Sequence, residues 1–109
     1  MTKITLLLLP VAISLGAWTT IVAADEVPRL DVARTCRAET VGENKAAVDA
    51  CLTDEQQARD QLTREWDRFA AQNRTNCTRE ATGIAGIQSY VELLTCLQIA
   101  RDVQNLRKE

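Results

Sequence analysis

The sequence contains no histidine among its 109 residues. Without an imidazole, the chain cannot build the Ser-His or Cys-His pairs that activate a nucleophile. Its four glycines are scattered and form no phosphate-binding loop. A carboxylate pair for glycoside hydrolysis stays open, although nothing marks one pair among the 15 acidic residues. We therefore expect a protein that is not an enzyme.

Long runs of one charge are also absent. The 13 basic and 15 acidic residues give a net charge of −2, and no more than two like charges are adjacent. A nucleic-acid-binding protein usually carries a basic patch, so we expect no nucleic-acid partner. Aromatic residues are few, at 4% of the chain. A small domain with such a thin core usually needs covalent support.

The one long apolar run, Ile4–Ala24, stands at the start of the chain. Val22 and Ala24 supply the small residues that signal peptidase accepts before a cut. The sequence thus predicts a cleaved signal peptide, residues 1–24, and one exported domain, residues 25–109. The location would be periplasmic or secreted, with membrane contact only before cleavage. An uncleaved anchor is the alternative, because the run is just long enough to span a bilayer.

All four cysteines lie in the exported part, and their even number predicts two disulfides. They are Cys36, Cys51, Cys77 and Cys96. Zinc sites need closely spaced ligand pairs, typically with two to four intervening residues. Here 14, 25 and 18 residues separate successive cysteines, and no histidine can complete a site. We therefore expect no metal, no haem and no other cofactor.

The spacing of apolar residues predicts helices almost throughout the exported part and no strands. The expected helices run from Pro28 to Glu39, from about 44 to 71, from 74 to 81, and from Ser89 to about 107. Pro28 suits a first helical turn. Ser89 and Glu92 form a capping box for the last helix. The fold class is therefore all-α, a small bundle of three to four helices.

The cysteine positions favour a pairing of Cys36 with Cys51 and of Cys77 with Cys96. In an antiparallel helical hairpin, residues equally far from the turn face each other, and each of these pairs is centred beside a glycine. Cys51 and Cys77 are instead centred inside an expected helix. The preferred fold is thus two helical hairpins, each closed by its own disulfide, although connectivity is not fixed by sequence alone.

One acidic residue, Glu55, lies in the middle of the apolar face of the expected long helix. A buried carboxylate needs a partner. Arg59, one turn further on, and Arg101, beside the apolar face of the last helix, are the candidates. We interpret Glu55 as part of an ion pair at the helix interface. A polar spot in a ligand-binding groove is the alternative.

The stretches "SYVELLTCLQIARD" and "ACLTDEQQARDQL" resemble small exported four-cysteine helical proteins of Gram-negative bacteria. That resemblance implies a periplasmic location and no particular activity. The chain is more distantly similar to the lysozyme-inhibitor-like four-cysteine helical domain of bacterial envelopes. The positions that carry this second likeness are Cys51, Trp66, Cys77, Tyr90 and Cys96.

Together these observations predict a non-enzymatic binding or structural protein of the cell envelope, with an envelope protein as its partner. The alternative is an inhibitor of a cell-wall hydrolase such as lysozyme. A cationic enzyme of that kind would be attracted to a mildly acidic surface.

Overall fold

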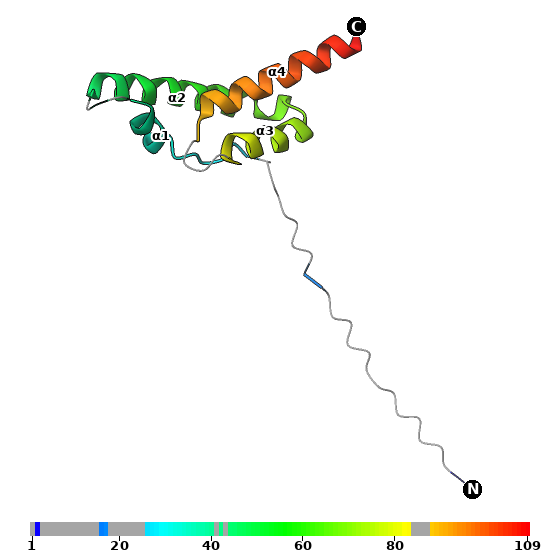
Figure 1. Ribbon diagram of the computed structural model, residues 1–109. Coiled ribbons are helices and arrows are strands. Elements are labelled where there is room, and N and C mark those ends of the chain that lie inside the picture. Colours follow the sequence, from blue (N-terminus) through cyan, green and yellow to red (C-terminus); the bar gives the residue numbers. More distant parts are fainter. Residues whose placement is uncertain (1, 3–15, 18–25, 41, 43, 84–87) are drawn as a thin grey trace.

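The computed structural model describes residues 2, 16–17, 26–40, 42, 44–83 and 88–109. The elements in chain order are α1 (Val32–Glu39), α2 (Lys45–Glu65), the 3₁₀ turn η1 (Trp66–Arg68), α3 (Ala71–Gly83) and α4 (Tyr90–Lys108). Figure 1 shows these helices packed together. The described part of the chain contains no strand, so the all-α prediction is confirmed. The expected signal-peptide cleavage site at Ala24 lies outside the described residues.

Three of the helices begin where a polar side chain caps the first turn. Asp31 accepts from the Arg34 amide at 3.2 Å, so α1 starts at Val32 and not at Pro28 as the sequence suggested. Asn44 caps α2 in the same way. Such caps satisfy amides that have no partner within the helix.

The long helix expected to reach residue 71 ends earlier, at Glu65. The chain tightens into η1, and the Phe69 amide donates to the Trp66 carbonyl at 3.2 Å. Phe69 itself is extended, with φ −80° and ψ 140°. A 3₁₀ turn at the end of a helix is common. Here it turns the chain into α3 while both aromatic side chains stay buried.

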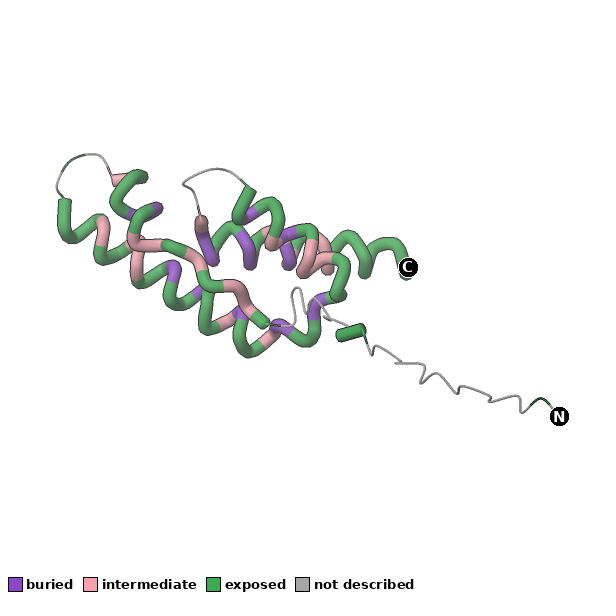
Figure 2. Tube along the Cα trace, turned by 90° about the horizontal axis from the view of Figure 1, so that it is seen from below, coloured by how far each residue is buried: buried purple, intermediate pink, exposed green. Residues whose placement is uncertain are grey.

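The core lies where α2 and α3 pack against α4 (Figure 2). Leu62 of α2 and Leu93 and Leu97 of α4 are fully buried. The last turns of α4, in which residues 102–109 are all exposed, extend past the rest of the bundle (Figures 1 and 2). Val103 lies on the side of α4 away from Leu93 and Leu97 and is 42% exposed.

Both predicted disulfides are confirmed. Cys36–Cys51 joins α1 to α2, and Cys77–Cys96 joins α3 to α4, with Cα separations of 5.6 and 5.7 Å. The molecule is thus two helical hairpins, each closed by its own bond. Disulfides of this kind persist in oxidising compartments outside the cytoplasm.

Local pairing predicts the outcome of a digestion. Complete tryptic cleavage of denatured, unreduced protein after Arg68 should give two sets of peptides, one linked through Cys36–Cys51 and the other through Cys77–Cys96. No peptide should join one set to the other, because each bond lies wholly on one side of Arg68. Mass spectrometry before and after reduction checks this, and a peptide containing Cys51 linked to Cys77 would contradict it.

Candidate functional site

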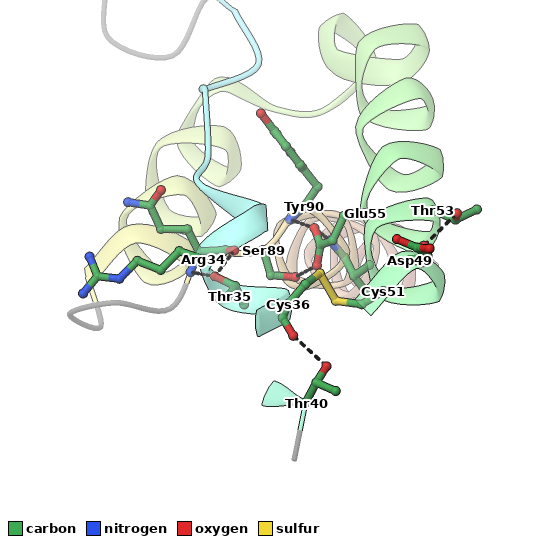
Figure 3. Close-up of a disulfide and its surroundings, with 12 residues drawn as sticks. Arg34, Thr35, Cys36, Thr40, Asp49, Cys51, Thr53, Glu55, Ser89 and Tyr90 are labelled. Atoms are coloured by element: carbon green, nitrogen blue, oxygen red, sulfur yellow. Dashed lines mark hydrogen bonds between the residues drawn. A yellow bond between two sulfur atoms is a disulfide. The ribbon is translucent and has the colours of Figure 1, made fainter. Parts of the chain in front are cut away.

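The carboxylate of Glu55 crosses from α2 to the first turn of α4 (Figure 3). It accepts a hydrogen bond from the Ser89 hydroxyl at 2.5 Å and from the Tyr90 amide at 2.6 Å. The Val91 amide donates to it at 3.4 Å. The residue is 5% exposed. The first amides of a helix lack partners and carry positive partial charge, so a carboxylate there is stabilised.

The structure therefore gives Glu55 a different partner from the predicted ion pair. Arg101 lies 3.6 Å from the Glu65 carboxylate and its guanidinium lies over the Phe69 ring. Arg59 lies over the Tyr90 ring, 5.7 Å from its centroid. Within the described residues, neither arginine forms an ion pair with Glu55. The start of α4 instead supplies the donors to Glu55, which are the Ser89 hydroxyl and the backbone amides of Tyr90 and Val91.

The sequence indicated the capping box at Ser89 but not that Glu55 would bond to the same helix start. Ser89 does accept from the Glu92 amide, at 3.2 Å, as the capping box predicts. Glu92 itself is exposed, and Glu55, 34 residues before Ser89, provides the carboxylate that bonds to the start of the helix. A capping box shows that a carboxylate belongs at a helix start, but a more distant residue can supply it.

The segment before α1, residues 26–31, is fastened to the same end of α4. The Tyr90 hydroxyl donates to the Pro28 carbonyl and accepts from the Leu30 amide, both at 3.0 Å. The Gln88 side chain accepts from the Asp31 amide at 2.7 Å. This end of α4 is therefore a structural junction, and its polar groups are engaged in holding the bundle together.

Removal of the Tyr90 hydroxyl tests this junction. We expect Tyr90→Phe to lower the free energy of unfolding by about 1 kcal/mol, because two hydrogen bonds are lost at a site that is partly accessible to water. Amides of residues 26–31 should exchange faster with solvent, whereas those of α2 should not. Hydrogen exchange with mass spectrometry measures both, and equal acceleration throughout the bundle would contradict the local role.

A second feature, the outer face of α4, has no such structural role. Four large apolar side chains on this helix are exposed: Val91 41%, Ile99 59%, Val103 42% and Leu106 71%. At 100° per residue they fall within a sector of about 120°, opposite the buried leucines of the same helix. We call these four residues the outer stripe.

The N-terminal half of the outer stripe borders a shallow groove of about 510 Å³ between α4 and α3. Its lining is mainly apolar, with Val91, Ile99 and Ala100 among the residues. Two exposed carboxylates, Glu80 of α3 and Glu92 of α4, also line it. The groove therefore combines an apolar surface with acidic groups, an arrangement suited to a protein surface carrying apolar and basic groups.

The described residues contain neither a cluster of potential metal ligands nor a candidate membrane-spanning helix. Among them, no three histidine, cysteine, aspartate or glutamate side chains are grouped so as to hold a metal ion. No helix in the described part of the chain combines the length and apolar character needed to cross a bilayer.

The chain matches no family model, no curated protein and no solved structure. The candidate site therefore depends on the geometry of this molecule alone. Among the described residues, the outer stripe and its groove form an exposed surface that is largely apolar.

Proposed function

We propose that this protein is a non-enzymatic, periplasmic binding or structural module of the cell envelope, and that it contacts an envelope protein through the outer stripe of α4. The observation that carries the proposal is the exposure of four large apolar side chains on one helix face. A contiguous apolar patch bordered by polar groups is typical of a protein-binding surface.

The engagement of reactive groups within the fold supports a role without catalysis. Glu55, the buried carboxylate, accepts three hydrogen bonds from α4 and the residue before it. All four cysteines are in disulfides. These groups therefore stabilise the fold.

The periplasmic location is supported by the two disulfides and by the apolar run at the start of the sequence. The disulfides also hold each hairpin closed, and Cys77–Cys96 fixes the N-terminal half of α4 against α3. Pre-organisation of this kind lowers the entropic cost of binding.

Capture from a detergent-free envelope extract tests the function. The oxidised protein should capture a defined partner, and Ile99→Glu should abolish capture because it places a charge in the stripe. Asn105→Glu is the matched control, since it adds the same charge to the same helix on a different face. Equal capture by all three proteins, or capture of no protein, would refute the proposal.

A second candidate function, inhibition of a cationic cell-wall hydrolase such as lysozyme, is favoured by the two carboxylates at the groove. Acidic groups beside an apolar surface would attract such an enzyme and orient it. The test is lysis of a bacterial cell suspension by lysozyme in the presence of this protein. Wild-type protein should slow lysis, and the double variant Glu80→Gln and Glu92→Gln should not. If lysozyme lyses the cells equally fast with and without wild-type protein, this role is excluded.

A further inference from the structure

We propose that the outer stripe binds a second copy of this chain, with the two α4 helices antiparallel about a twofold axis at Ile99. The inference depends on the proposed role of the stripe as a protein-binding surface. A second copy is the proposed occupant of the stripe. An envelope partner that binds the same stripe would compete with the second copy.

The two halves of α4 differ in shape in a way that suits this pairing. The N-terminal half lies along α3 and forms one wall of the groove. The C-terminal half extends past the bundle (Figures 1 and 2), and every residue from 102 to 109 is exposed. It presents Val103 and Leu106 on the outer stripe. The free half of one copy can thus lie along the groove of the other, and the reverse contact forms at the same time.

The register follows from the spacing of the apolar residues. If Ile99 lies opposite itself, then Val103 faces Thr95 of the other copy and Leu106 faces the first turn of α4, near Val91. Val103 and Leu106 of one copy therefore lie against the lining of the groove in the other, beside Val91 and Ile99. From residue 91 to residue 106 the helix rises about 22 Å at about 1.5 Å per residue, so the contact extends over about four turns.

Charges select the antiparallel arrangement. Glu80 and Glu92 lie at the groove, near the start of α4, whereas Arg107 and Lys108 lie in its last turn. In the antiparallel register Arg107 of one copy lies opposite Val91 of the other, next to Glu92. A parallel arrangement would instead bring the two Glu92 carboxylates together and the two Arg107 groups together. Like charges across an interface disfavour a complex.

A twofold contact of this kind is closed, because each copy uses the same surface and none is left for a third. The stripe has four large apolar residues per copy, so the interface is small. Interfaces at the small end of the range form weak complexes. We therefore expect a monomer–dimer equilibrium rather than a permanent dimer, with no larger species.

Sedimentation equilibrium of the oxidised protein, from about 1 μM to about 1 mM, tests the proposal. Wild type should shift from monomer to dimer across this range. Ile99→Glu sets two carboxylates face to face at the twofold axis and should weaken the dimer at least ~10-fold. Asn105→Glu adds the same charge on another face of the helix and should leave the equilibrium unchanged.

A charge exchange then tests the register. Glu92→Arg and Arg107→Glu should each weaken the dimer, and the double variant should restore it, because each exchanged pair again carries opposite charges across the twofold axis. Thermal unfolding of all variants confirms that the bundle is intact. Each of three results would overturn the proposal: a monomer at the highest concentration, a dimer insensitive to Ile99→Glu, or a double variant as weak as the single ones.

These results also separate the inference from the proposed function. If the wild type stays monomeric but captures an envelope protein through Ile99, the second copy is the wrong occupant and the binding function stands. If it forms the dimer and captures no envelope protein, the inference stands and the proposed envelope partner is wrong.

Discussion

Replacement of both Cys77 and Cys96 by alanine should lower the free energy of unfolding by about 2–5 kcal/mol. The bond joins residues 19 apart in sequence, and closing a loop of this size in the unfolded chain contributes about 3 kcal/mol in the chain-entropy model. A loss of this size is a large fraction of the 5–15 kcal/mol typical of whole domains. Urea unfolding followed by circular dichroism at 222 nm measures the change.

The effect should be concentrated in α3 because few side chains of that helix are buried. Its buried residues are Cys77 and Ala81, and it has no acidic residue in its first turn and no basic residue in its last. It therefore lacks both a large apolar face and favourable charges at its ends. Hydrogen exchange of the variant should show lost protection in α3 and retained protection in the buried part of α2.

The corresponding change at Cys36 and Cys51 is the matched control. It also removes one disulfide, of sequence separation 15, but its loss should loosen α1 and leave α3 protected. If the Cys77 and Cys96 variant loses less than about 1 kcal/mol, or if both variants lose protection in the same segments, the disulfides do not act on separate hairpins.

The disulfide pairing was predictable because it depends on local geometry. A cysteine on each arm of a helical hairpin, equally far from the turn, needs no knowledge of how the hairpins pack together. The caps by Asp31 and Asn44 are local too, since the side chain bonds to an amide three residues on. Asp31 could have corrected the expected start at Pro28, because an aspartate before a helical stretch favours an N-cap.

What the sequence did not indicate depends on contacts between distant segments. The helical periodicity of α2 continues through Trp66 and Phe69, so the pattern contains no sign of the corner that the fold makes there. The apolar residues of α4 extend around the helix to Val103, on the side away from Leu93 and Leu97, and no described element covers that side. Periodicity shows which side of a helix is apolar, but it does not show how much of that side is covered.

The partner of Glu55 is the clearest case. Its position on an apolar face indicated burial and the need for a partner, and both arginines were plausible on charge. A helix N-terminus is also an electropositive partner, but which helix start would lie opposite α2 depends on the packing of the two hairpins. Glu55 thereby links the hairpins, since α2 belongs to one and α4 to the other.

Glu55→Ala should therefore destabilise the fold as strongly as a core substitution, by about 3 kcal/mol. The change leaves the buried Ser89 hydroxyl and the Tyr90 amide without their acceptor. Buried donors without partners cost about 1–3 kcal/mol each, and the favourable charge at the helix terminus is lost as well. Glu55→Gln keeps the size of the side chain, but its neutral amide offers one accepting oxygen and one donating NH₂ group to these donors. The loss in free energy of unfolding should be about half of that for Glu55→Ala. Thermal and urea unfolding give both values.

Glu92→Gln is the matched control, because Glu92 is an exposed carboxylate in the same first turn of α4. Loss of an exposed charge near a helix terminus costs about 0.3–1 kcal/mol, so this variant should remain close to wild type. If Glu55→Ala and Glu92→Gln destabilise equally, the contribution of Glu55 would be one of charge alone. A much larger loss for Glu55→Ala, accompanied by faster amide exchange at the start of α4, would show that the buried hydrogen bonds join the two hairpins into one cooperative unit.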